Sequence, residues 1–117
     1  MAKRRRQRTK APQAEYRSPD GDVLVLRGSM TPKTRQQYAA VLAGEGRPAA
    51  TTDDAWQRAA EFLFERLAAR WEVQGVAYAR QDELLARFRM ASADERRWIR
   101  DTLREHVAEH FPDLRTP

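Results

Sequence analysis

Cysteine is absent from this 117-residue chain, which excludes disulfides, thiolate metal sites and a cysteine nucleophile. Also absent is any apolar stretch near the ~20 residues that cross a bilayer as a helix. The chain begins with basic residues, but residues 11–22 are polar where a signal peptide has its apolar stretch. We therefore expect a cytoplasmic protein without a membrane partner.

Acidic residues are missing from the first ten positions, which hold six basic ones: Lys3, Arg4, Arg5, Arg6, Arg8 and Lys10. Residues 11–117 then have 16 basic and 17 acidic side chains, so the net charge of +5 belongs to this basic arm (residues 1–14). No aromatic residue separates the arm cations, so the arm can bind phosphates by releasing counterions but cannot stack on bases.

We predict that the basic arm binds a polyanion, and nucleic acid is the favoured one. Three alternatives stay open. The arm can serve only as a solubility tail, it can bind an acidic protein surface, or it can reflect the arginine-rich composition that GC-rich coding produces, since the chain has 19 arginines and three lysines.

Apolar residues make up 41% of the chain and charged residues 33%, a balance typical of one folded domain of this length. We expect a mainly α fold: a small bundle of about four helices, preceded by a short β-hairpin and by a disordered basic arm. The domain limits are 1–14 for the arm and 15–117 for the helical domain, with the hairpin at 15–28.

The expected hairpin has a Pro-Asp-Gly turn after Tyr16, followed by an apolar strand. Both faces of that strand are apolar, and its partner run is short, so one backbone edge stays open. We therefore predict a dimerisation or partner-docking site at Val23, Leu24, Val25 and Leu26.

Caps and apolar spacing predict four helices. The first begins at Thr31 and ends near Gly44, and the second begins at Thr52 and runs to Val73. The third covers residues 80–89. The fourth opens with a capping box at residues 92–95 and ends before Pro112. Trp98 lies away from the apolar stripe of this last helix, which makes it a second candidate contact for a protein partner.

The sequence His106-Val107-Ala108-Glu109-His110 fits the H-x-x-E-H pattern of inverted zinc peptidases. The chain is too short to build the cleft and the third ligand that such enzymes need, and His110 falls within the apolar stripe. We expect two partly buried histidines and no catalytic residue, metal, cofactor or small-molecule substrate.

The last helix also carries arginines on one flank and carboxylates on the other, which permits a DNA-binding interpretation. Asp94 and Glu95 at its start would repel phosphates, so we favour a solvated, ion-paired flank.

These observations favour a bacterial, non-enzymatic accessory or adaptor protein. Its helical body associates with a protein partner or a second copy, and its arm holds a polyanion. The alternatives are a small DNA-binding transcriptional regulator that uses the last helix, and a small zinc-dependent enzyme at His106, Glu109 and His110.

Overall fold

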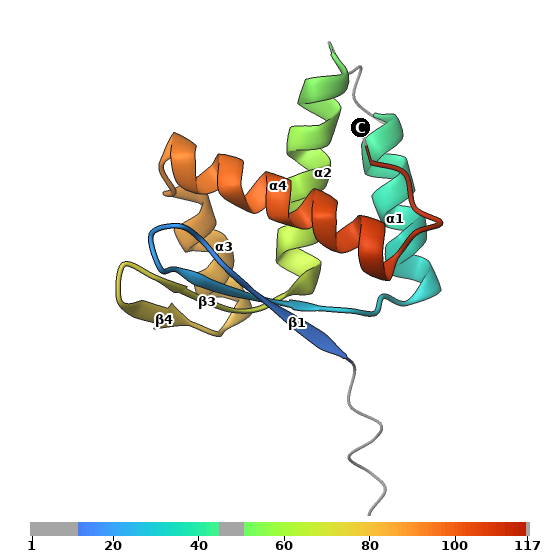
Figure 1. Ribbon diagram of the computed structural model, residues 1–117. Helices are drawn as coiled ribbons and strands as arrows, with labels where there is room; N and C mark the ends of the chain where they lie inside the picture. The colour runs from blue at the N-terminus through green and yellow to red at the C-terminus, as the bar shows by residue number, and fades with distance from the viewer. Residues whose placement is uncertain (1–11, 45–50, 117) are drawn as a thin grey trace, which may run out of the picture.

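The computed structural model describes residues 12–44 and 51–116, so the six cations of the basic arm lie outside the described residues. Eight elements follow one another along the chain (Figure 1): β1 (Gln13–Arg17), β2 (Val23–Arg27), α1 (Pro32–Ala43), α2 (Thr52–Leu67), β3 (Ala68–Val73), β4 (Val76–Tyr78), α3 (Gln81–Arg89) and α4 (Ala93–His110).

The fold is mixed α/β, and the prediction of a mainly α bundle with an attached hairpin was wrong. The four strands form one antiparallel sheet in the order β1-β2-β3-β4. The expected hairpin forms as β1 and β2, but it is only half of this sheet. Its first strand begins at Gln13, so two residues that we had assigned to the arm belong to the sheet.

The error comes from the segment after α2, which we expected to stay helical as far as Val73. The helix is capped by Thr51 rather than Thr52, and it ends at Leu67. From there the backbone is extended, and its side chains alternate: Trp71 and Val73 point into the core, while Glu72 points away from it. This alternation is typical of a strand and not of a helix. A two-residue turn then reverses the chain, with positive φ angles of 51° at Gln74 and 80° at Gly75.

Strand β3 pairs with the edge of β2 that we expected to be open. The open-edge argument for partner docking is therefore wrong, because β2 is an interior strand with a neighbour on each side. Leu24 and Leu26 are fully buried, so they contact core residues rather than solvent. Val23 is also buried, and Val25 is partly exposed.

The helices stand on one face of the sheet, and α4 runs across α2 (Figure 1). The side chains between these layers form one apolar core. On the opposite face, Val23 and Val25 lie between two ion pairs along neighbouring strands, Arg17–Glu15 at 3.2 Å and Arg70–Glu72 at 2.5 Å.

Within the described residues, no helix has the length and apolar character needed to cross a membrane.

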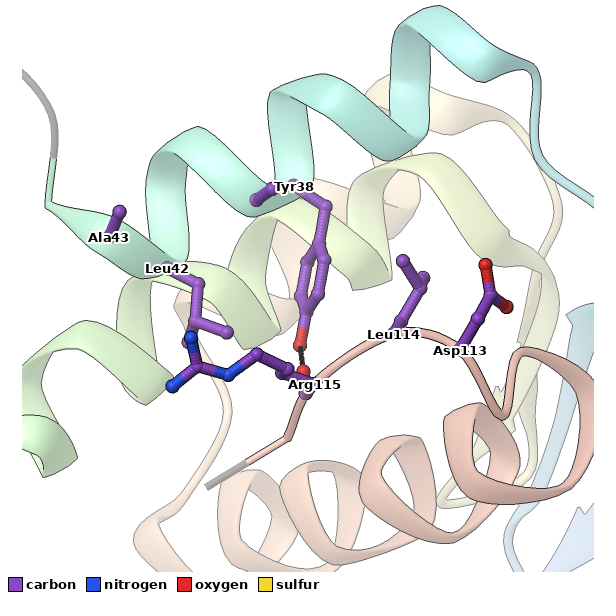
Figure 2. A pocket seen from close by; sticks show the side chains of 7 residues that line it. Tyr38, Leu42, Ala43, Asp113, Leu114 and Arg115 are labelled. Atoms are coloured by element: carbon purple, nitrogen blue, oxygen red, sulfur yellow. Dashed lines mark hydrogen bonds between the residues drawn. The ribbon is translucent and has the colours of Figure 1, made fainter.

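The segment after α4 packs against α1 (Figure 2). The Tyr38 hydroxyl donates a hydrogen bond to the backbone carbonyl of Arg115, and burial raises the pKa of Tyr38 to about 12. Arg35 pairs with Asp113 at 2.9 Å. Between this segment and α1 lies a mostly apolar cavity of about 240 Å³, bordered by Tyr38 and Leu114.

The β1–β2 hairpin is attached to α4 by His106, whose side chain is fully buried. Its Nε2 lies 2.8 Å from the carbonyl oxygen of Arg27, which can only accept, so Nε2 carries the proton. Its Nδ1 then accepts from the Tyr16 hydroxyl at 2.7 Å. Burial lowers the pKa of His106 below its ordinary value of 6.5, which keeps the ring neutral in the folded protein.

This arrangement predicts a loss of stability in mild acid. The pKa of His106 is lower in the folded than in the unfolded chain, so its contribution is present above pH 6.5 and is lost as the pH falls below that value. Urea unfolding at pH 7.5, 6.5 and 5.5 measures the loss.

The variant His106→Gln should abolish most of that pH dependence, whereas His110→Gln should retain it. Tyr16→Phe removes the donor to Nδ1 and should cost about 1–2 kcal/mol at pH 7. A pH dependence that persists in His106→Gln would show that another group is responsible.

Candidate functional site: an acidic groove at the start of α4

The His106–His110 pair does not have the geometry of a zinc site. Both ring nitrogens of His106 are already engaged, so a metal at either one has to displace a hydrogen bond. The two imidazole centroids are 4.5 Å apart, and the Glu109 side chain is exposed. In the part of the chain that the structure describes, no three His, Cys, Asp or Glu residues are grouped to hold a metal ion.

Trp98 lies in the wall of an open groove of about 460 Å³, which brings together segments far apart in the sequence. The β1–β2 turn forms one side and the β3–β4 turn another, while the first two turns of α4 form the third. Twelve residues line the groove: Ser18, Pro19, Asp20, Asp22, Trp71, Gln74, Ser92, Asp94, Glu95, Arg97, Trp98 and Asp101.

Hydrogen bonds hold the two hairpin turns in place beside α4. Ser18 closes the first turn, since its hydroxyl accepts from the backbone N–H groups of Asp20 and Asp22 at 3.2 and 3.1 Å. The Asp22 carboxylate accepts from the backbone N–H of Gln74 at 3.2 Å, which links the two turns. The side chain of Gln74 then donates to Glu95 on α4 at 3.1 Å.

Glu95 connects the start of α4 to its surroundings. It completes the expected capping box, because its carboxylate accepts from the backbone N–H of Ser92 at 3.0 Å while the Ser92 hydroxyl accepts from the backbone N–H of Glu95 at 3.1 Å. The carboxylate also pairs with Arg87 at 3.1 Å. Desolvation raises its pKa, but the hydrogen bonds from Ser92, Arg87 and Gln74 outweigh it and lower the pKa below the ordinary 4.5.

The groove has an excess of negative charge, since five carboxylates and one guanidinium line it. Glu95, Asp94 and Asp101 each pair with an arginine: Asp94 with Arg97 at 2.8 Å, and Asp101 with Arg104 at 3.1 Å. Neither Asp20 nor Asp22 takes part in an ion pair within residues 12–44 and 51–116. The uncompensated charge therefore lies on the hairpin side of the groove.

Two indoles contribute the apolar part of the groove. Trp71 is 1% exposed, and its ring lies against Phe64 and beneath the guanidinium of Arg87, 5.2 Å from the ring centroid. Its Nε1 is buried without a hydrogen-bond partner. Trp98 is only partly buried, so part of its ring remains available to another molecule.

Of the residues predicted from sequence to contact a partner, only Trp98 lies in this groove. The spacing of the last helix correctly placed it away from the apolar stripe, and the structure puts it beside Asp94 and Asp101. The contribution of Asp20 and Asp22 was missed, because the first hairpin turn and α4 lie far apart in the sequence and meet only in the tertiary fold.

Comparison with protein-family models, with curated proteins and with solved structures finds no match for this chain. The interpretation of the groove therefore depends on its own chemistry.

Replacing Glu95 with glutamine should lower the free energy of unfolding at pH 7 by about 1 kcal/mol, because the capping box and the Arg87 pair both lose their charge. Because the pKa of Glu95 is lower in the folded than in the unfolded chain, its charge stabilises the fold above pH 4.5. This stabilisation is lost as the pH falls below 4.5 and through the lowered pKa. The difference between wild type and Glu95→Gln should therefore shrink between pH 7 and pH 4.

Urea unfolding checks this prediction, with Glu109→Gln as the control. Glu109 is an exposed carboxylate on the same helix but outside the groove, so its replacement should change stability little. Equal losses in the two variants would contradict the role assigned to Glu95.

Proposed function

We propose that this chain is a non-enzymatic adaptor of the bacterial cytoplasm that joins two ligands of opposite charge. Its basic arm holds a polyanion, for which nucleic acid is the candidate. Its acidic groove holds a basic segment of a protein partner. The observation that carries the proposal is the exposed part of Trp98 in a groove whose carboxylates come from both the β1–β2 turn and α4.

A basic segment fits the groove for two reasons. Guanidinium and ammonium groups bind carboxylates through charge-assisted hydrogen bonds, and Asp20 and Asp22 have no ion pair to exchange with any residue that the structure describes. The same cations are attracted to the face of an indole, which Trp98 supplies. Nucleic acid is a poor ligand for this surface, because the carboxylates repel its phosphates.

Packing supports an association role more than a DNA-reading role for α4. The buried side of α4 packs into the core through Ile99, Leu103 and Val107. Its first turn places Asp94 and Glu95 in the acidic groove. A recognition helix presents its N-terminal residues to base edges, so this end would meet DNA with two carboxylates.

The groove can be tested with an unstructured peptide that contains six arginines, titrated into the full chain by isothermal calorimetry. We expect binding that weakens about tenfold in Trp98→Ala and about threefold to tenfold in Asp22→Asn, since each loses one cation contact. Glu109→Gln is the matched control and should bind like wild type.

A second measurement guards against general electrostatic attraction. The same peptide with glutamines in place of arginines should not bind. Loss of affinity in Glu109→Gln equal to that in Asp22→Asn would refute a localised groove, as would unchanged affinity in Trp98→Ala, provided that both variants keep the wild-type circular dichroism spectrum.

The arm makes a separate prediction. Replacing its six cations with glutamine should abolish binding to generic duplex DNA while leaving peptide binding at the groove intact. For wild type, the logarithm of the DNA affinity should fall with the logarithm of salt concentration with a slope approaching about −5 if all six cations contact phosphates. Tight DNA binding by the neutralised variant would contradict the arm assignment.

A further inference from the structure

Four arginines from three helices converge on the flank of α4 opposite the acidic groove. Arg58 comes from α2 and Arg89 from α3, while Arg96 and Arg100 lie one turn apart on α4. They border a groove of about 200 Å³ together with Gln57, Glu61 and Phe88. Because α4 runs across α2 (Figure 1), residues nearly forty positions apart in the sequence meet here.

The positive charge of this arginine cluster is not balanced by its neighbours. Glu61 is the one carboxylate among the lining residues, and it is bound by Arg89, whose Nε lies 2.8 Å from its Oε2. Arg58 and Arg100 take part in no ion pair within the described residues. Four guanidiniums therefore face one carboxylate in a body that is close to neutral.

Two guanidinium nitrogens of the cluster are buried without an acceptor among the residues that the structure describes, namely Nη2 of Arg58 and Nε of Arg96. Other contacts hold Arg96 in place: its Nη2 donates to the backbone carbonyl of Arg89 at 2.5 Å, and its guanidinium lies 5.7 Å from the centroid of the Phe88 ring. A buried donor without an acceptor costs free energy, and a rotation of either guanidinium onto an oxyanion bound in the groove would remove that cost.

We propose that the arginine cluster binds a phosphate group. Guanidiniums donate in forked pairs that match the oxygens of a phosphate, and several of them surround one anion in phosphate-binding sites. A divalent phosphate would also neutralise more of the excess charge than a single carboxylate can. The same chemistry fits a free phosphate compound and a backbone phosphate of nucleic acid, and the two sources are separable by experiment.

The test uses the full chain with the six arm cations replaced by glutamine, so that phosphate binding at the arm does not contribute. Inorganic phosphate and pyrophosphate are titrated against thermal unfolding, with sodium chloride at matched ionic strength as the reference. Both ligands should raise Tm, and pyrophosphate should raise it at lower concentration. Arg58→Gln and Arg100→Gln should each weaken the apparent affinity about tenfold, which corresponds to the loss of a charged hydrogen bond.

Arg97→Gln is the matched control, because it removes the same charge from α4, the helix of Arg100, but on the side of the acidic groove. It should leave the phosphate response unchanged, and Arg58→Lys should keep part of it. In the absence of phosphate, Arg58→Gln should be at least as stable as the parent, because it relieves repulsion and removes an unpartnered donor. A variant that binds phosphate more weakly but is no less stable without phosphate has lost a ligand contact. A purely structural role for Arg58 would instead lower the stability without phosphate.

A short DNA duplex distinguishes the two sources of phosphate. If the arm-neutralised chain binds the duplex and Arg58→Gln abolishes that binding, the ligand is a backbone phosphate, and the arm prediction above is wrong while the arginine cluster stands. If it binds pyrophosphate but not the duplex, the ligand is a free phosphate compound. A phosphate response that is absent, or that is the same in Arg58→Gln, Arg100→Gln and Arg97→Gln, overturns the proposal.

Discussion

The backbone of β2 lies in the interior of the sheet, so its N–H and C=O groups need a strand on each side. Strand β1 supplies one set of partners, and the segment after α2 supplies the other. This requirement explains why residues 68–73 form a strand and do not continue α2. It also fixes the position of the Gln74–Gly75 turn, and with it the wall that the second hairpin contributes to the acidic groove.

Helix α4 gives the two charged surfaces their relative position. Its buried stripe sets the rotation of the helix, and the remaining positions are then divided between two flanks. Asp94, Trp98 and Asp101 face the hairpin turns, while Arg96 and Arg100 face α2 and α3. Oppositely charged surfaces thus lie on one helix without neutralising each other, because the apolar contacts of the helix separate them.

Local signals allowed some of this to be predicted from sequence. The capping box at residues 92–95, the start of the first helix at Thr31 and the first hairpin were all predicted from a few adjacent residues, and each forms. The end of α2 was not predicted, because Ala68 and Ala69 fit a helix as well as a strand. Which of the two they form depends on pairing with β2, about forty residues earlier in the chain. The acidic groove and the arginine cluster were missed for the same reason: each combines residues that only the tertiary fold brings together.

The first hairpin has a mechanical consequence. Strand β1 begins at Gln13, three residues after the last cation of the arm, and ends at the turn that borders the acidic groove, so the cations and the groove lie toward opposite ends of a five-residue strand. Such a strand is roughly 17 Å long. The buried hydrogen bonds of His106 to Tyr16 and to Arg27 keep this strand from swinging relative to α4. The hairpin therefore acts as a rigid spacer, and tension applied at Gln13 is transmitted to the core through His106 and through the pairing of β1 with β2, whose Leu24 and Leu26 are fully buried.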